Sequence, residues 1–271
     1  MKERAGPERA ASEAGTGTGS LVRFEGVTRT FGERSALEAL DLDIREREVL
    51  GLIGPNGAGK TTALRILCGL LEPSAGRATV GGHDTRAEPL EARRLLAFVP
   101  DGAPLYANLS PMQHLALVGR LHGLEEERIE SEGRRLLAAL DLADRADDPV
   151  GTFSRGMRQK AALACAILPK PRLLVLDEPL NGLDAPTTAV FKEVLRAWAD
   201  RGGSVLYTSH LLDVAERVCD RIAILAEGKL VAVGTMDELR ALAGRDGTLE
   251  QVFGALTKSE DPRAQAERLL G

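Results

Sequence analysis

The sequence predicts an α/β protein built on a mainly parallel β-sheet, with a helical insertion in the middle of the chain. Two short runs, Val49–Ile53 and Leu173–Leu176, are apolar throughout, as strands buried on both faces of a parallel sheet are. Strand and helix patterns alternate after residue 173, which is typical of right-handed βαβ units. Between these stretches, residues 88–167 carry amphipathic helix patterns punctuated by proline and glycine.

The first elements are strands, and the first helix follows a glycine-rich loop. Strand patterns cover residues 21–26 and 40–45, and the buried strand Val49–Ile53 runs directly into the loop. After the loop, an apolar stripe predicts a helix, with Leu64, Leu67, Leu70 and Leu71 on one face.

The later elements follow the same kind of pattern. Within the insertion we expect no strand and three helices, at 88–94, 112–121 and 125–140. Beyond residue 173 we expect helices at 187–201 and 211–220 and strands at 204–208, 222–225 and 229–233. Residues 1–20 are polar and without periodicity, which predicts a disordered leader, and residues 236–271 predict a helical tail.

The composition of the chain argues against several classes of function. The 271 residues include 35 basic and 40 acidic side chains, interspersed, so a nucleic-acid partner is not expected. The longest purely apolar run, residues 161–168, is far shorter than the roughly 20 residues of a membrane-spanning helix. Residues 1–20 lack the apolar stretch of a secretory signal, which predicts a cytoplasmic location. Three cysteines match neither a zinc spacing nor a disulfide framework and are expected in the core: Cys68, Cys165 and Cys219.

The glycine-rich loop fits the Walker A pattern of nucleotide-binding proteins. It reads Gly54-Pro55-Asn56-Gly57-Ala58-Gly59-Lys60-Thr61-Thr62 and stands between a strand and a helix. Glycines let backbone N–H groups converge on phosphate oxygens at the positive end of the helix. Lys60 is expected to reach the β- and γ-phosphates, and the Thr61 hydroxyl to bind Mg²⁺. Kinases, GTPases and transport ATPases all share such a loop, so other residues must discriminate among them.

Two acids and a histidine are predicted at the ends of neighbouring strands. Asp177 and Glu178 directly follow Leu173–Leu176, and His210 follows strand 204–208. The carboxyl ends of parallel strands meet at the edge where ligands bind. There Asp177 would bind Mg²⁺, Glu178 would accept a proton from an attacking water, and His210 would reach a γ-phosphate. Taken alone, the two acids fit the start of a solvent-exposed loop equally well.

Together these motifs resemble the ATP-binding subunit of ABC transporters over about residues 21–234. Residues 54–62 are similar to Walker A, 173–178 to Walker B, 181–184 to the D-loop, 208–210 to the switch histidine and 153–159 to the signature motif. The resemblance implies a P-loop NTPase core with an N-terminal antiparallel β subdomain. It also implies an ATPase domain over 21–235, with the helical insertion at about 88–167.

The resemblance further implies that two such domains stack head to tail around two ATP molecules. Ser154 and Gly156 would then contact the γ-phosphate bound by the partner, with Ser154 also capping the helix that follows. Phe31 occupies the place of the aromatic residue that stacks on adenine, although a core position is the alternative. Whether the dimer joins identical chains or two different ATPase subunits stays open.

Among the residues that depart from the family pattern, two bear directly on the expected site. Asp101 stands where the family usually has glutamine, and as an oxygen ligand it would add negative charge near Mg²⁺. Arg155 replaces a glycine of the signature motif; it would either reach the partner's phosphates or point to solvent, and we favour solvent. The Gly156-Met157 pair followed by basic residues resembles the exporter branch called ABC-2 type.

The function that the resemblance implies is hydrolysis of ATP with Mg²⁺ to power a separate integral membrane subunit of an exporter. The chain would then be peripheral on the inner face of the cell membrane. The partner is expected to contact the surface around 101–123, where Tyr106, Leu109 and Met112 are either contact residues or core. The alternative is a soluble nucleotide switch of the same family that is not coupled to transport.

Overall fold

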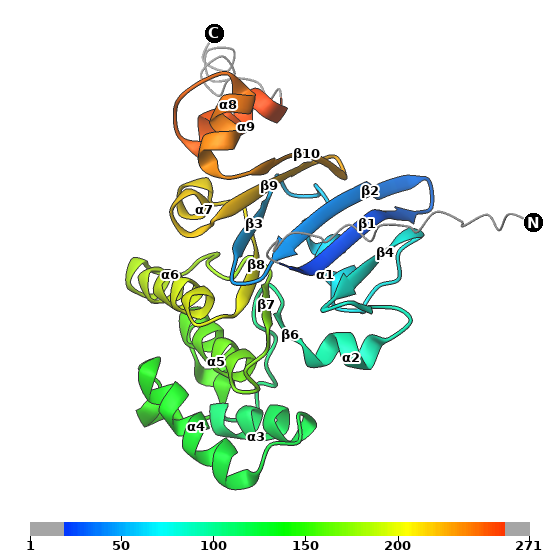
Figure 1. Ribbon diagram of the computed structural model, residues 1–271. Helices are drawn as coiled ribbons and strands as arrows, with labels where there is room; N and C mark the ends of the chain where they lie inside the picture. The colour runs from blue at the N-terminus through cyan, green and yellow to red at the C-terminus, as the bar shows by residue number, and fades with distance from the viewer. Residues whose placement is uncertain (1–18, 258–271) are drawn as a thin grey trace, which may run out of the picture.

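The computed structural model describes residues 19–257, which fold into two β-sheets with helices packed around them (Figure 1). Residues 1–18 of the expected leader and 258–271 of the expected tail lie outside the described residues. Cys68 and Cys165 are buried and Cys219 is half-buried, and all three are free, which confirms their place in the core. Within residues 19–257, no helix combines the length and the apolar character that crossing a bilayer requires.

The larger sheet has six strands and is mainly parallel, as predicted. Its strands, in spatial order, are β10 (Lys229–Gly234), β9 (Arg221–Ala226), β3 (Val49–Ile53), β8 (Ser204–Ser209), β7 (Leu173–Leu176) and β6 (Leu96–Val99). Only the β10–β9 pair is antiparallel among the described strands of this sheet. Every residue of β3, β7 and β8 is buried, which explains their continuous apolar or small side chains.

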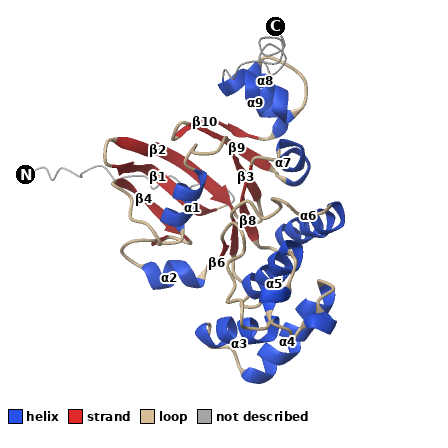
Figure 2. Ribbon diagram, turned by 180° about the vertical axis from the view of Figure 1, so that it is seen from behind, coloured by secondary structure: helices blue, strands red, loops and turns tan. Residues whose placement is uncertain are grey.

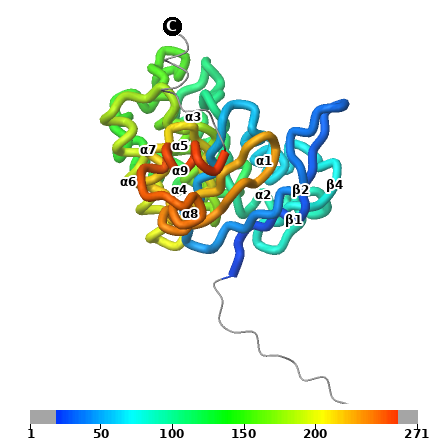
Figure 3. The backbone as a smooth tube through the Cα atoms, turned by 90° about the horizontal axis from the view of Figure 1, so that it is seen from above, coloured from blue at the N-terminus to red at the C-terminus, as the bar shows by residue number. Residues whose placement is uncertain are grey.

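The smaller sheet is antiparallel and is formed by strands from the N-terminal part of the chain, between residues 20 and 84, as the resemblance implied. Its spatial order is β2 (Arg34–Arg45), β1 (Ser20–Phe31), β4 (Ala75–Val80) and β5 (His83–Asp84). Seen from above, β1, β2 and β4 lie on one side of the molecule and α5, α6 and α7 on the other (Figure 3). The larger sheet separates two apolar clusters, because alternate residues of its strands, such as Val49 and Leu50, belong to different clusters.

Helices cover the larger sheet and extend the molecule at both ends. They are α1 (Lys60–Leu67), α2 (Pro89–Arg94), α3 (Pro111–Leu121), α4 (Glu126–Ala139), α5 (Arg155–Ile167), α6 (Ala185–Asp200), α7 (Leu212–Val218), α8 (Met236–Ala243) and α9 (Leu249–Thr257), with short 3₁₀ turns at 143–145 and 150–152. Two views place α3 and α4 at one end of the molecule and α8 and α9 at the other (Figures 1 and 2). The tail predicted as helical is therefore helical as far as Thr257.

Two local expectations were wrong. The insertion was expected to hold no strand, yet Leu96–Val99 forms β6 and pairs in parallel with β7 at the edge of the larger sheet. Helix α1 ends at Leu67, so Leu70 and Leu71 lie beyond it, and Leu70 is exposed. The helix stops early because the chain turns at Gly69, whose positive φ of 65° suits glycine.

The parallel pairing brings three loops to one edge of the larger sheet. Ile53 pairs with Ser209, and Leu176 pairs with Tyr207, so β3, β8 and β7 end side by side. The glycine-rich loop, Asp177 with Glu178, and His210 follow these three strand ends. The fold thus gathers at one place residues that the sequence separates widely.

Candidate functional site

Two of these loops, the glycine-rich loop and the loop that begins with Asp177 and Glu178, line a cavity of about 450 Å³ at the carboxyl edge of the larger sheet. Its lining holds most of the predicted site residues and consists of Phe31, Arg34, Ala36, Pro55, Asn56, Gly57, Ala58, Gly59, Lys60, Thr61, Thr62, Asp101, Asp177 and Glu178. Gly54 and His210 lie next to this lining, because the Gly54 carbonyl accepts a hydrogen bond from Lys60 and His210 contacts Glu178. The structure therefore brings together most of the residues that the sequence analysis assigned to the site.

The glycine-rich loop has a shape that only glycine allows at two places. A Cβ at Gly54 would lie 2.1 Å from the Leu225 carbonyl oxygen, and one at Gly59 would lie 2.4 Å from that of Ala36. Gly59 is also the N-cap of α1, with φ at 107° and no side chain to accept from the first-turn N–H groups. Uncapped N–H groups at the positive end of a helix suit an anion, so the loop fits phosphate.

Lys60 is a buried cation at the base of the loop. Its side chain is 6% exposed, and its Nζ donates to the carbonyl oxygens of Gly54 at 2.6 Å and Pro55 at 3.3 Å. The same Nζ lies 3.5 Å from Glu178 Oε1. The loop thus holds a positive charge where a polyphosphate would need compensation.

Asp177 and Thr61 supply hard oxygen atoms at the other side of the cavity. Asp177 is buried, and its Oδ2 accepts a hydrogen bond from the Thr61 hydroxyl at 3.0 Å. In the part of the chain from 19 to 257, no group of three or more His, Cys, Asp or Glu side chains could hold a metal. Mg²⁺ requires only one or two protein oxygens when it also binds phosphates, so this pair fits Mg²⁺.

Glu178 connects the lysine to the histidine. His210 Nδ1 lies 2.7 Å from Glu178 Oε2, and the His210 backbone N–H donates to the same oxygen at 3.3 Å. With the Lys60 contact, all three side chains predicted to be catalytic form one chain of contacts. Glu178 adopts a positive φ of 48°, which is unusual for a residue with a side chain.

Phe31 lies at the rim of the cavity and not in the core. The residue is 49% exposed, which excludes the alternative of core packing. The Arg29 guanidinium lies 4.6 Å from the ring centroid, in a cation–π contact. An exposed ring at the rim is suited to stacking on a planar base.

Ser154 and Gly156 do not line this cavity. They lie in a separate cavity of about 400 Å³ whose lining is Ser154, Arg155, Gly156, Met157, Lys160, Gly182, Leu183, Asp184 and Thr187. The expectation that Ser154 caps a helix is confirmed, because its Oγ accepts from the Met157 N–H at 3.2 Å at the start of α5. Hydrogen bonds from Thr187 lower the pKa of Asp184, which caps α6 in the same cavity.

Arg155 remains 44% exposed, as expected of a side chain that points to solvent, but it also has a charged partner. Its guanidinium donates to Asp101 Oδ1 at 3.3 Å, across two loops. It also packs on the loop after β7, since a Cβ at Gly182 would lie 3.4 Å from the guanidinium. Opposite charges thus hold the exposed Arg155 side chain beside Asp101.

Two residues of the site escaped the sequence analysis. Arg34 lines the cavity from the start of β2, and its guanidinium would lie 3.5 Å from a Cβ at Gly57. No local sequence pattern identifies Arg34 as a site residue.

Thr208 is the second residue. It lies two residues before His210, and its hydroxyl contacts Asp177 and Glu178. The position of Thr208 near the end of a buried strand could have indicated a site residue, but its hydrogen-bond partners depend on how β7 and β8 are aligned.

Comparisons with known proteins show the family of the chain. A family model described as ABC transporter matches residues 37–181. The chain is 39% identical to a daunorubicin resistance ATP-binding protein of Streptomyces coeruleorubidus over 84% of this chain and 72% of that protein. It is 30% identical to a linearmycin resistance ATP-binding protein of Bacillus subtilis, over 88% and 77% of the two chains. A solved structure of an ATP-binding subunit of an ABC transporter superposes with a TM-score of 0.83 and 33% identity, over 88% of this chain and 100% of that one. With that match of sequence and fold, the chain belongs to the ABC transporter family, among its ATP-binding proteins.

Proposed function

We propose that this chain hydrolyses ATP to ADP and phosphate and thereby powers a separate membrane-spanning subunit of an exporter. The observation that carries the proposal is the contact chain from Lys60 through Glu178 to His210, beside the Thr61–Asp177 pair. One cavity thus combines a phosphate-binding loop, oxygen ligands for Mg²⁺ and a carboxylate able to accept a proton. Phosphoryl transfer requires mainly positioning and electrostatic stabilisation, which such a set provides.

Each side chain then has a defined role. The loop N–H groups and Lys60 bind the phosphates, and Phe31 stacks on the adenine ring. Glu178 accepts the proton of the attacking water, and His210 contacts the γ-phosphate while its Nδ1 stays against Glu178. Thr61, Asp177 and Asp101 would hold Mg²⁺, which when bound neutralises charge on the phosphate oxygens.

A second copy or a related ATPase subunit completes the site. Ser154 and Gly156 lie in their own cavity, apart from the Walker A loop of the same chain. Helix α5 begins there with its N-terminus capped only by the Ser154 side chain. In a head-to-tail dimer this helix end would face the γ-phosphate bound by the partner.

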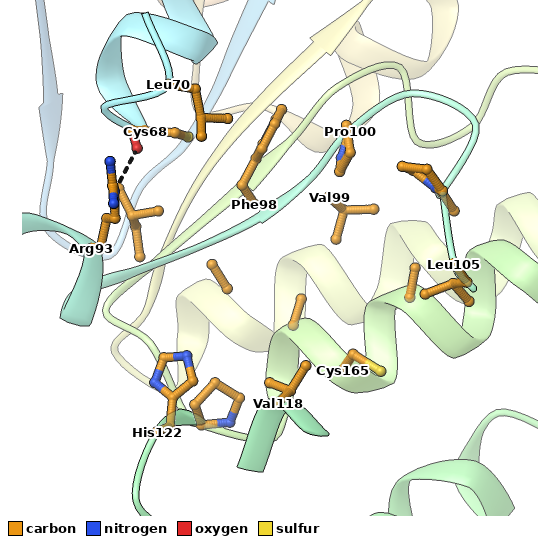
Figure 4. A pocket seen from close by; sticks show the side chains of 17 residues that line it. Cys68, Leu70, Arg93, Phe98, Val99, Pro100, Leu105, Val118, His122 and Cys165 are labelled. Carbon is orange, nitrogen blue, oxygen red and sulfur yellow. Dashed lines mark hydrogen bonds between the residues drawn. The ribbon is translucent and has the colours of Figure 1, made fainter. Parts of the chain in front are cut away.

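The membrane subunit is proposed to dock in an apolar groove between the sheet and the helical insertion. The groove encloses about 470 Å³ and is formed by the end of α1, by β6 and the loop after it, and by α3 and α5. Figure 4 shows Phe98 of β6 lying between Leu70 and Cys68 above and Val118 and Cys165 below. The groove borders the surface expected at 101–123. There Met112 is core, whereas Tyr106 is exposed and available for contact.

Docking would place the chain on the inner face of the membrane. The relatives are named as resistance ATP-binding proteins, and this favours an exporter over a soluble nucleotide switch. Residues 21–235 would form the ATPase domain, with 88–167 as the insertion that meets the membrane subunit.

Two substitutions test the docking groove. Leu70 lines the groove and is 61% exposed, so Leu70→Asp places a charge on the apolar surface with little effect on folding. Leu242 on α8 is 63% exposed and far from the groove, so Leu242→Asp is a matched control. We expect Leu70→Asp alone to reduce co-purification with the membrane subunit. Equal retention of the subunit by both variants would refute this docking site.

Phosphate release from Mg-ATP tests the function as a whole. The purified chain is measured alone and after reconstitution in liposomes with the membrane subunit that co-purifies with it. We expect ADP and phosphate to form, at a higher rate with the subunit. Binding of ATP without hydrolysis in both preparations would instead favour the soluble switch.

A further inference from the structure

Thr208 lies at the end of β8, and its hydroxyl contacts both acidic residues that follow β7. The hydroxyl donates to Asp177 Oδ1 at 2.7 Å and accepts the backbone N–H of Glu178 at 2.9 Å. The side chain is fully buried, so water does not compete for these two hydrogen bonds. A single hydroxyl therefore connects the proposed metal ligand with the proposed base.

Strand register puts Thr208 at this position. In the larger sheet β8 lies between β3, which precedes the phosphate loop, and β7, which precedes Asp177. Leu176 pairs with Tyr207, so the next residues of the two parallel strands, Asp177 and Thr208, come side by side. On the other side of β8, Thr208 pairs with Leu52 of β3. Among the described strands, Thr208 thus lies on the one that pairs both with the strand before the phosphate loop and with the strand before Asp177.

The carboxylate of Asp177 is oriented by two threonines. Thr61 donates to Oδ2 at 3.0 Å, and Thr208 donates to Oδ1 at 2.7 Å. With one donor on each oxygen, the plane of the carboxylate is held in a single orientation. Removing a hydrogen-bond partner of a metal ligand typically lowers metal affinity or activity about 10- to 100-fold.

The backbone of Glu178 gives an independent reason for Thr208. Glu178 has a φ of 48°, a conformation that costs energy in a residue with a Cβ. Its N–H donates a hydrogen bond to the Thr208 hydroxyl oxygen, a side-chain acceptor. The turn directs the Glu178 side chain to Lys60 and His210. The Thr208 hydroxyl therefore stabilises the strained turn that aims the base.

We propose that Thr208 is a positioning residue that couples the metal ligand Asp177 to the base Glu178. This inference rests on the proposed function, because it concerns the same site. It requires a side chain that both donates and accepts a hydrogen bond, so serine should replace it and valine should not. Valine has nearly the shape of threonine, so Thr208→Val removes the hydroxyl without opening a large cavity.

The test compares Thr208→Val, Thr208→Ser and the control Thr85→Val. Thr85 is also buried, and its hydroxyl donates to the Ile66 carbonyl near the far end of α1, so the control measures the loss of a buried hydroxyl away from the site. Binding of Mn²⁺, as a probe for Mg²⁺, is followed by electron paramagnetic resonance with a non-hydrolysable ATP analogue. We expect Thr208→Val to weaken Mn²⁺ binding about 10- to 100-fold. Thr208→Ser and Thr85→Val should stay within about threefold of the unaltered chain.

Turnover and a crystal structure complete the test. Thr208→Val should lower kcat more than it raises KM for ATP, because metal and base are both displaced while the phosphate loop is intact. Unchanged Mn²⁺ affinity and kcat in Thr208→Val would overturn the proposal, and so would equal losses in Thr208→Val and Thr85→Val. The crystal structure of Thr208→Val should show Asp177 reoriented and the Glu178 turn relaxed, and an unmoved pair would contradict the inference. This last readout stands even if the unaltered chain proves not to hydrolyse ATP, so the two failures are distinguishable.

Discussion

The Arg155 guanidinium donates a hydrogen bond to the Asp101 carboxylate at 3.3 Å, although 54 residues separate the two in the chain. Asp101 follows β6 and lines the candidate nucleotide cavity, whereas Arg155 begins α5 beside the Ser154 cavity. Both residues depart from the family pattern, and here they are partners. The added negative charge of Asp101 is thus balanced by the added positive charge of Arg155.

This pair should contribute little to stability. The side chains of Arg155 and Asp101 are 44% and 52% exposed, and exposed ion pairs typically contribute about 0.2–1 kcal/mol. A double-mutant cycle of Arg155→Gln and Asp101→Asn, measured by denaturant unfolding, should give a coupling free energy in that range. A coupling of several kcal/mol would show that the pair is a structural support and not a weak, breakable contact.

The charge of Asp101 should instead affect the need for Mg²⁺. A carboxylate near the γ-phosphate repels it unless a cation lies between them, so Asp101→Gln should make phosphate release less dependent on Mg²⁺ concentration. Hydrolysis itself should be retained in that variant. A titration of activity against Mg²⁺ checks this, with Asp41→Asn as a control for loss of an exposed acid outside the cavity. Identical Mg²⁺ curves for the unaltered chain and Asp101→Gln would show that Asp101 does not act on the metal.

Glu178→Gln should separate binding from hydrolysis. The amide keeps the size of the side chain and removes the proton acceptor, so ATP should still bind while turnover falls about 10²- to 10⁴-fold. Equilibrium binding of a fluorescent ATP analogue and phosphate release measure the two effects. Glu250→Gln, on the exposed surface of α9, should behave as the unaltered chain does. Normal turnover in Glu178→Gln would remove this residue from the role of base.

Buried thiols should make the fold sensitive to alkali. Burial raises the pKa of Cys68 and of Cys165 to about 12, whereas a thiol in the unfolded chain ionises near pH 9. Above about pH 9 the unfolded state therefore holds fewer protons than the folded state, and the free energy of unfolding should fall as pH rises. Denaturant unfolding between pH 8 and about pH 10 measures this slope. Cys165→Ala removes one thiol and should lessen the slope, and an unaltered slope would contradict the assignment.

The elements predicted most accurately from the sequence are those that are buried on both faces. Strands β3 and β7 begin and end where their apolar runs do, because every side chain in them contacts the core. Strand β4 was missed because only two of its six residues are buried and it contains Gly76 and Arg77. Pairing with β1 makes it a strand, and no local pattern encodes that pairing. Strand β6 has four residues, too few to stand out among helix patterns.

The same distinction applies to the residues of the site, because local motifs mark some of them and tertiary packing alone positions the others. The phosphate loop, Asp177, Glu178 and His210 could be predicted because each is tied to a strand end by a local motif. The contact between Arg155 and Asp101 could not be predicted, because it depends on how α5 packs beside β6. The role of Thr208 depends on the parallel register of β7 and β8, which the sequence does not display.

The central claim is that a triphosphate binds at the glycine-lined start of α1 and that Lys60 holds it there. The most direct measurement is the dissociation constant for ATP of the purified chain and of Lys60→Ala, with thermal unfolding as a check of folding. The account predicts that ATP binds the unaltered chain and that Lys60→Ala weakens binding roughly ten- to hundredfold, since hydrogen bonds to charged groups contribute about 1.5–3 kcal/mol. Lys192→Ala on α6 should have no effect. Absence of ATP binding by the folded chain, or equal affinity in Lys60→Ala, would contradict the account.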